Sequence, residues 1–271
     1  MDPRIKRLKQ AGLTLVELMI ALSLSLLMMA LVFTSVLADG AAYEATRSSN
    51  QLVHQSRMNL HLLRLYLQQA GYREFEQILN NVIPEPVTAV QQIGGFAWTW
   101  DHGQVLQGLN NQSASHTQAS SDVIAIRYYG SDVDNGEVYR CDGERLLSGE
   151  LNTLVVYVTN GNQLMCADSF ATAGVVLEVG VEQLQVEYAP NLDGQYRYLN
   201  AAEVGSGVDN WSQIGHLRLV LLQSQDMARA PAAVSQSYQL LDTSVTVAGE
   251  TSGKARQVVR DNISLPNNRG V

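Results

Sequence analysis

Basic residues are scarce in this chain of 271 residues, which has 18 lysines and arginines against 26 acidic residues and a net charge of −8. After Ala38 the only lysine is Lys254. Proteins that bind nucleic acid directly neutralise its phosphates with clusters of basic side chains. Because no such cluster is present, we expect no direct binding of nucleic acid.

Motifs of known enzymes are missing as well. The sequence contains no P-loop, no H-E-x-x-H, no G-x-S-x-G and no dinucleotide-binding glycine pattern between a strand and a helix. His54 and His61 share one face of a helical segment, but no acidic or sulfur ligand stands near them, so we interpret them as solvated surface residues. We therefore expect a protein that is not an enzyme and that has no cofactor.

Metal ligands are equally few. The only two cysteines have no histidine at metal-ligand spacing, and a structural zinc site needs four ligands. The segment D-V-D-N-G, residues 132–136, resembles the start of a calcium loop, although its glycine comes one place early and no bidentate glutamate follows. A hairpin turn is the favoured interpretation, and a calcium ion held by Asp132 and Asp134 is the alternative.

The sequence does contain one long apolar run, which follows a basic leader. Four cations stand within residues 4–9, and the apolar run extends over residues 13–38. A bilayer core needs roughly 20 apolar residues in a helix, so this run can cross a membrane. Glu17 is the exception within it, because an ionisable group at mid-bilayer costs roughly 2.5–3.5 kcal/mol.

Three simpler interpretations of this run compete. A secretory signal peptide has an apolar core of roughly 7–15 residues before a small-residue cleavage site, for which residues 36–38 could serve. The core here is longer and carries Glu17. A plain single-pass anchor explains everything except Glu17 and Gly12. A buried helix of a soluble protein conflicts with the basic flank and the continuous apolarity.

The segment G-L-T-L-V-E, residues 12–17, resembles the class III signal of prepilins, the precursors of type IV pilins and type II secretion pseudopilins. The resemblance implies that prepilin peptidase cuts between Gly12 and Leu13 and that Leu13 becomes N-methylated. It also implies that Glu17 forms an assembly salt bridge with the terminal amine of a neighbouring subunit. Such a salt bridge is physically reasonable, because a carboxylate in a medium of low dielectric constant is tolerable when it is paired with a cation.

The basic leader also indicates the topology. The positive-inside rule places the leader in the cytoplasm and everything after Ala38 in the periplasm, as expected for a single-pass protein of the bacterial inner membrane. Cleavage would leave 14 basic and 25 acidic residues, a net charge of −11. The expected order is a leader at 1–12, a transmembrane helix at 13–38, its amphipathic continuation at 39–71 and a periplasmic β-rich head at 72–271.

An oxidising compartment favours a disulfide between Cys141 and Cys166. Such a bridge would stabilise the fold by ~3 kcal/mol on the chain-entropy model. Asn160 and Gly161 predict a two-residue hairpin loop after a strand at 154–159. This loop would place Cys166 opposite Val155, with Cys141 reaching it from a third strand at 137–141.

The helical pattern continues beyond the membrane segment, over residues 41–70. Gly71 is a suitable helix stop, so the whole helix would have about 58 residues. The continuation is amphipathic and should lie on a folded domain. Its apolar face is predicted to consist of Val53, Leu60, Leu63, Leu67 and Ala70.

Between residues 72 and 121 the periodicity fails, which predicts a long connection. Phe96, Trp98 and Trp100 alternate within it and suggest a short strand with one aromatic face. Core packing of these rings is favoured over an exposed platform for a ligand. The remainder is strand-like, with half-buried alternation at 181–188 and 217–222. Further strands are expected at 123–129, 163–166, 196–199 and 256–265.

Several later segments resemble the PilW kind of minor pilin, over about half of the chain. They are G-V-E-Q-L-Q-V-E-Y at 180–188, the Asp193 and Gly194 pair, D-N-W-S-Q-I at 209–214 with the strand after it, residues 58–72, and I-S-L at 263–265. The resemblance implies a pilin-like α+β fold, in which a long N-terminal helix carries an antiparallel β-sheet domain.

The same resemblance implies a low-copy subunit of a type IV pilus. Such a subunit joins other minor pilins and the major pilin through its N-terminal helix, meets the inner-membrane assembly platform, and primes assembly of an extracellular fibre. It could sit at the tip with an adhesin and support twitching motility, adhesion or DNA uptake. Two alternatives stay open: a minor pseudopilin of a type II secretion system, and a membrane-anchored periplasmic ligand-binding module.

Overall fold

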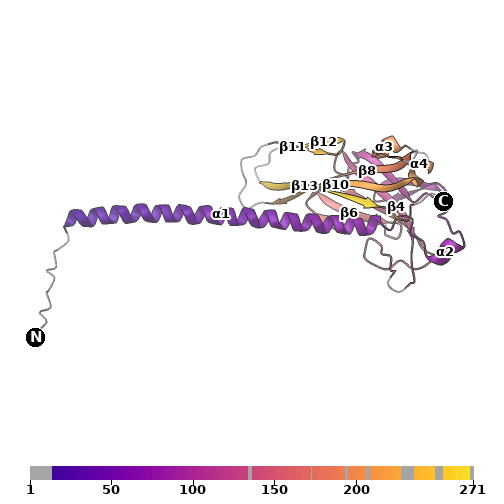
Figure 1. The fold of residues 1–271 in the computed structure, drawn as a ribbon, viewed down its shortest axis with the longest axis horizontal. Coiled ribbons are helices and arrows are strands. Elements are labelled where there is room, and N and C mark those ends of the chain that lie inside the picture. The colour runs from indigo at the N-terminus through magenta and orange to yellow at the C-terminus, as the bar shows by residue number, and fades with distance from the viewer. Residues whose placement is uncertain are drawn as a thin grey trace, which may run out of the picture. The chain divides into compact units, whose positions relative to one another are not determined.

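The computed structural model describes residues 14–133, 136–171, 173–192, 195–205, 208–226, 235–247 and 253–268. The chain divides into two compact units, Met1–Arg47 and Ser48–Val271, and we call the second the head unit. Helix α1, Leu15–Leu67, contributes to both (Figure 1). Gly12, Leu13 and Asp134 lie outside the described residues.

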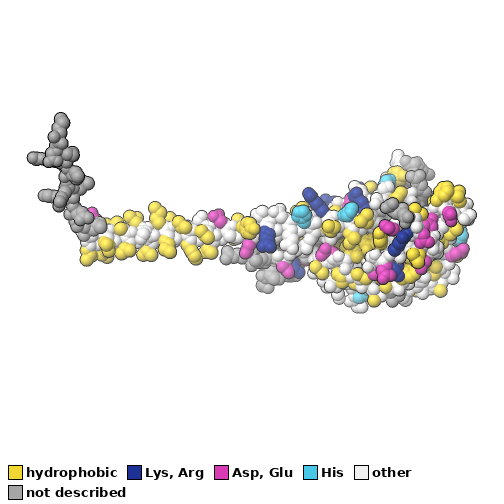
Figure 2. Space-filling view, turned by 90° about the horizontal axis from the view of Figure 1, so that it is seen from below, with side chains coloured by type: hydrophobic (Ala, Val, Ile, Leu, Met, Phe, Trp, Pro, Cys, Tyr) yellow, Lys and Arg dark blue, Asp and Glu magenta, His cyan; other side chains and the backbone are white. Residues whose placement is uncertain are grey.

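Within the first unit, α1 is apolar and exposed. Leucine, alanine and methionine, which favour helix, dominate its sequence. In the described part of the chain it is the one helix long and apolar enough to cross a membrane, and none of its apolar window is buried in the fold. Hydrophobic side chains cover this stretch in Figure 2. The prediction of an N-terminal membrane-type helix is confirmed.

Within the head unit, the buried face of α1 differs from the predicted one. Leu63 and Leu67 are buried as expected, but Val53 and Leu60 are only half-buried. Three residues that were not predicted take their place: Leu52, Ser56 and Asn59. Ser56 can be buried because its hydroxyl donates to the side-chain oxygen of Gln223, on a strand beneath it.

Helix α1 ends three residues earlier than predicted. A turn over residues 68–71 follows it, and Gly71 closes this turn with φ of +74°. The N–H of Gly71 then donates to the carbonyl of Arg127 at 2.8 Å, so the turn is attached to the sheet.

The five-stranded sheet of the head unit is antiparallel, with strand order β3-β4-β5-β6-β7. Its strands are β3 (Leu106–Gln112), β4 (Ser121–Tyr129), β5 (Leu151–Val158), β6 (Gln163–Asp168) and β7 (Val175–Val179). Every residue of β4 is buried, since both faces of this strand are covered.

A second, four-stranded antiparallel sheet has the order β13-β10-β8-β9. Its strands are β8 (Val181–Leu192), β9 (Gln195–Tyr196), β10 (Ile214–Asp226) and β13 (Lys254–Ser264). The predicted turn at Asp193 and Gly194 lies outside the described residues, but β8 and β9 on either side of it pair. Among the described residues of the head unit there are also three short helices: α2 (Phe75–Leu79), α3 (Ala201–Val204) and α4 (Val208–Ser212).

The main core lies on one face of both sheets, where it meets the C-terminal part of α1 (Figure 1). The opposite face of each sheet is covered by a separate hairpin. The β1–β2 hairpin (Val87–Ile93 and Phe96–Trp100) packs on the five-stranded sheet. The β11–β12 hairpin (Gln236–Leu240 and Thr243–Val247) packs on the four-stranded sheet. These layers confirm the α+β class.

The two hairpins correct two predictions. Residues 72–121 form α2, β1, β2 and β3 rather than one long connection. Strand β10 is buried on both faces over residues 219–224, since Val220 and Leu222 pack beneath β11 and β12, rather than half-buried throughout as predicted. Local sequence could not show this, because the second face is covered by a segment distant in sequence.

The aromatic strand packs as expected. Trp98 and Trp100 are 1% and 2% exposed in the cluster beneath β1 and β2, with ring centroids 6.2 Å apart. Buried rings cannot serve as an exposed platform for a ligand.

The hairpin between β5 and β6 has a different loop from the predicted one. The N–H of Thr159 donates to the carbonyl of Gln163 at 2.9 Å, which leaves three residues in the loop. Asn162 makes this loop feasible by taking a positive φ of 57°, which asparagine tolerates. The additional residue shifts the register by one, so Cys166 pairs with Val156 instead of Val155.

Candidate functional site: the start of the N-terminal helix and the stapled loop of the head

The start of α1 is a capping box. The carboxylate of Glu17 accepts hydrogen bonds from the N–H and the hydroxyl of Thr14, both at 3.0 Å. In return the N–H of Glu17 donates to the hydroxyl oxygen of Thr14 at 3.3 Å. This reciprocal arrangement satisfies free N–H groups at a helix start. The sequence signal for it is the spacing T-x-x-E, but the sequence analysis considered only the pairing of Glu17 with a neighbouring subunit and not this cap.

Most polar groups farther along this segment are satisfied by the helix itself. The hydroxyls of Ser23, Ser25 and Thr34 donate to backbone carbonyls three residues earlier, at 2.8–2.9 Å. Hydroxyls bonded in this way cost little in lipid and do not need a partner helix. The carboxylate of Glu17 is therefore the group in this apolar stretch that gains most from a partner of opposite charge.

The exposed surface of the segment is apolar along its length. Large side chains from Leu15, which is 76% exposed, to Phe33, which is 64% exposed, are not buried by any other described residue. A surface of this kind is stable in a bilayer or against the apolar helices of other proteins. This part of α1 is therefore suited to a bilayer or to side-by-side packing against other apolar helices.

In the head unit, the predicted disulfide is present between Cys141 and Cys166, whose Cα atoms are 5.5 Å apart. Cys141 does not come from a strand at 137–141, because that segment is a loop with one isolated bridge between Tyr139 and Arg145. The disulfide thus staples the β4–β5 connection to β6. We call residues 131–133 and 136–150 the stapled loop.

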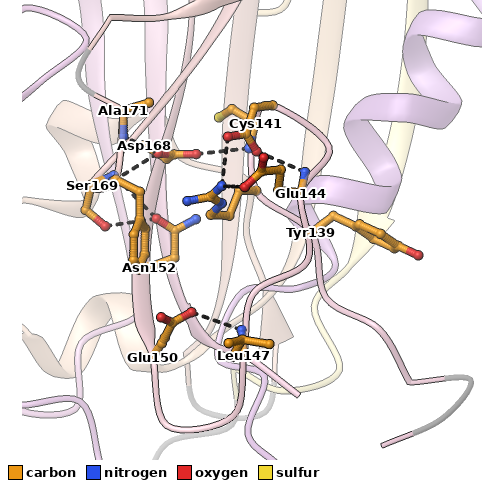
Figure 3. Close-up of polar contacts among 12 residues, drawn as sticks. Tyr139, Cys141, Glu144, Leu147, Glu150, Asn152, Asp168, Ser169 and Ala171 are labelled. Atoms are coloured by element: carbon orange, nitrogen blue, oxygen red, sulfur yellow. Dashed lines mark hydrogen bonds and ion pairs between the residues drawn. The ribbon is translucent and has the colours of Figure 1, made fainter. Parts of the chain in front are cut away.

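Asp168 binds the stapled loop at Cys141 (Figure 3). One carboxylate oxygen accepts the N–H of Cys141 at 3.0 Å, and the other accepts the N–H groups of Phe170 at 3.0 Å and Ala171 at 2.8 Å. Asp168 is fully buried, and three N–H donors replace the water it loses. Sequence reasoning missed this residue, because its contact with the stapled loop is a bond to the backbone of Cys141, 27 positions away.

A second buried polar group holds the neighbouring part of this loop. Tyr128 donates its hydroxyl to the carbonyl of Tyr139 at 2.8 Å and accepts from the amide of Asn152 at 2.9 Å. Burial raises the pKa of Tyr128 well above its usual value, so it remains a neutral donor. The loop is therefore fixed by hydrogen bonds as well as by its disulfide.

Asp132, from the calcium hypothesis, lies at the start of the stapled loop. Its carboxylate accepts the N–H of Ser148 at 3.1 Å, and its own N–H donates to Glu74 at 2.6 Å. Asp134 lies outside the described residues. Among the residues that are described, no three acidic, histidine or cysteine side chains gather where they could hold a metal. The calcium hypothesis stays a prediction.

Comparison with known proteins adds four findings. A solved type IV-like pilin from Thermus thermophilus is 18% identical, with 80% of this chain and 97% of that chain covered and a TM-score of 0.44. None of the curated proteins matches the chain. Residues 7–33 match the prokaryotic N-terminal methylation motif, and residues 155–267 match the family of type IV pilus-assembly protein W.

The N-terminal match includes the apolar part of α1 up to Phe33, so this segment is similar to the start of proteins that carry the N-terminal methylation motif. The second match extends from β5 through β13, so this part of the head unit is similar to the family of type IV pilus-assembly protein W. By length and composition, α1 is a helix that could cross a membrane.

Proposed function

We propose that this chain is a minor pilin that joins other minor pilins in a complex that primes pilus assembly and sits at the pilus tip. The observation that carries the proposal is the start of α1. There the carboxylate of Glu17 caps a helix whose following side chains are apolar and exposed. Such a helix needs apolar neighbours, and its acid needs a cation.

The proposed sequence of events follows from these two needs. The precursor inserts with its leader in the cytoplasm and its head unit in the periplasm. Prepilin peptidase cuts between Gly12 and Leu13, and Leu13 is N-methylated. The helix then moves laterally against the helices of neighbouring subunits. Glu17 exchanges its local bonds to Thr14 for a terminal ammonium of a neighbour, a stronger partner in a low dielectric.

Three variants of the full chain separate the charge of Glu17 from its capping role. Glu17→Gln keeps an acceptor for Thr14 but removes the charge. Thr14→Ala removes the cap partner but keeps the charge. Glu44→Gln, on the exposed part of the same helix, is the matched control. Cells that carry each variant are scored for cleavage of the precursor and for its amount in sheared pili.

We expect Glu17→Gln to be cleaved normally but to enter pili about tenfold less, which corresponds to ~1.4 kcal/mol of lost pairing. Glu44→Gln should match the wild type, and Thr14→Ala should lie much closer to the wild type than Glu17→Gln does. Incorporation of Glu17→Gln equal to that of Glu44→Gln would refute the pairing role.

Deletion of the gene tests whether the chain belongs to a type IV pilus or to a type II secretion system. Loss of surface fibres and of twitching, with protein secretion intact, supports the minor pilin of a pilus. Loss of secreted enzymes with normal fibres would instead assign the chain to a type II secretion system.

A further inference from the structure

Helix α2 is oriented with its apolar side chains outward. Phe75, Ile78 and Leu79 are 73%, 53% and 67% exposed, whereas the polar Gln77 between them is buried. A helix on a protein surface normally does the opposite. Burial of each such apolar side chain would contribute roughly 1.5–3 kcal/mol, so this orientation forgoes considerable stability. We call these three side chains the α2 platform.

Hydrogen bonds fix this orientation. The N–H of Glu74 donates to the side-chain oxygen of Gln77 at 2.9 Å, in a capping box that begins α2. The carboxylate of Glu74 accepts the N–H of Asp132 at 2.6 Å and the hydroxyl of Ser148. The serine hydroxyl lowers the pKa of Glu74 and keeps it ionised. The platform is therefore held rigidly against the stapled loop, at the end of the head unit where α1 ends (Figure 1).

Two further exposed apolar residues belong to the segments that Glu74 joins. Val133 follows Asp132 and is 57% exposed, and Leu147 precedes Ser148 and is 53% exposed. The hydrogen bonds of Glu74 thus join three segments that are distant in sequence. In each segment an exposed apolar residue is the immediate neighbour of the hydrogen-bonded one: Phe75, Val133 and Leu147. Isolated exposed apolar residues are ordinary, but a set on fixed backbone indicates an interaction surface.

An acidic groove of about 790 Å³ adjoins the platform. Glu74, Glu76 and Glu85 line it, and within the described part of the chain no lysine or arginine does. Its wall is also fixed, because the guanidinium of the buried Arg127 donates to the carbonyl of Glu85 at 2.8 Å. Glu76 and Glu85 form no ion pair with any described residue, so their carboxylates are available to a cation from outside.

We propose that the α2 platform and the acidic groove together dock a segment of another protein that presents an apolar side chain next to lysine or arginine. The apolar anchor would cover Phe75, Ile78 and Leu79, and the cation would enter the groove between Glu76 and Glu85. Anchors in a fixed apolar patch supply most of the affinity of an interface, and complementary charge supplies orientation and specificity.

Charge excludes the other occupants. An acidic groove repels the anionic headgroups of a membrane surface, and it repels nucleic acid for the same reason. A second copy of this chain is a poor match, because acidic residues exceed basic residues by 11 once the leader is removed. A basic partner protein remains, and its docking is separate from the helix packing proposed above.

Site-specific photocross-linking in cells tests this inference with the full chain. A benzoylphenylalanine is placed at Ile78, and a matched control is placed at Val176 on β7, which is also exposed and apolar. Cross-linked peptides are sequenced by mass spectrometry. The same measurement is repeated with Glu76→Lys, and with Asp226→Lys as a charge reversal outside the groove.

We expect Ile78, but not Val176, to cross-link to a protein segment in which an apolar residue neighbours lysine or arginine. Glu76→Lys should lower the yield at least about fivefold, since a like charge in the groove repels the cation, whereas Asp226→Lys should not. Equal thermal midpoints of the purified variants in detergent would show that the loss is not one of folding.

Other outcomes overturn the proposal. Cross-linking at Ile78 that does not exceed that at Val176, that ignores Glu76→Lys, or that reaches only lipid or a second copy of this chain would each do so. A further cross-linker at Leu24 on α1 keeps the two proposals apart. Contacts from Leu24 to other pilins, without contacts from Ile78, would leave the proposed function standing and reject the docking surface.

Discussion

The carboxylate of Asp122 on β4 accepts the N–H of Val186 on β8 at 2.8 Å, and this bond joins the five-stranded and the four-stranded sheets. The other carboxylate oxygen accepts the N–H of Asn111 at 2.8 Å. Ser121 beside it exchanges hydrogen bonds with the backbone of Leu184 at 3.1–3.2 Å. The two sheets are thus connected by side chains at the start of β4, where no ladder of backbone pairs links them.

Asp122 should make stability depend on pH. Burial raises its pKa to about 7, so in the native protein it holds a proton that the unfolded chain releases near pH 4. Native Asp122 binds more protons between those values, so its contribution is complete below about pH 4 and declines as the pH rises toward 7. At one pKa unit per 1.36 kcal/mol, the decline is about 4 kcal/mol at most.

Asp122→Asn tests this in the full chain, by urea unfolding in detergent at pH 5 and pH 8. The variant should lose most of the pH difference of the wild type, because asparagine does not titrate. It should also be less stable at pH 5, since its amide nitrogen would face one of the two N–H donors. An unchanged pH difference in the variant would show that other groups cause it.

Removal of the disulfide should loosen the stapled loop without abolishing the fold. Replacement of both Cys141 and Cys166 by serine should lower the free energy of unfolding by about 3 kcal/mol, as expected for a closed loop of this length. Urea unfolding with and without reductant provides the measurement. The wild type should lose a similar amount on reduction, whereas the double variant should not respond to reductant.

Asp168 should contribute more to the free energy of unfolding than neighbouring acidic residues nearer the surface. Asp168→Ala leaves three backbone N–H groups without their acceptor inside the fold, and we expect a loss of about 3 kcal/mol. Asp142→Ala, which removes a partly exposed ion pair with Arg140 and an acceptor for the N–H of Glu144, should cost less, about 1 kcal/mol. Equal losses in thermal or urea unfolding would argue against the anchoring role of Asp168.

Gly71 cannot be replaced by a larger residue for two reasons, its positive φ and the close approach of the backbone of Asn267. Comparison with Gly143, which shares only the positive φ, separates them. The φ of Gly71 is +74°, and a Cβ there would lie 2.7 Å from the carbonyl oxygen of Asn267. Gly143 has a φ of +81° and open space around it. Gly143→Ala should therefore cost only the backbone strain, about 1 kcal/mol, whereas Gly71→Ala should cost clearly more because backbone atoms must move. Similar unfolding free energies for the two variants would contradict this contact.

Patterns that depend on near neighbours in sequence predicted the correct elements. Strand β4 was expected from residues 123–129 and is observed at Ser121–Tyr129, and the strand at 256–265 is observed as β13. The register of β6 was wrong by one residue, because it depends on whether Asn162 takes a positive φ in the loop. Both answers are compatible with the local sequence, and packing of Cys166 into the core selects one.

The sequence by itself determined the apolar helix, the acid within it and the pair of cysteines, because hydropathy, charge and residue type are properties of consecutive positions. Only the tertiary structure decided the burial of Ser56 against Gln223, the bond from Asp168 to the stapled loop and the outward-facing side chains of α2. Each of these depends on a hydrogen bond to a residue more than 25 positions away, and such a contact leaves no periodic signal in the sequence.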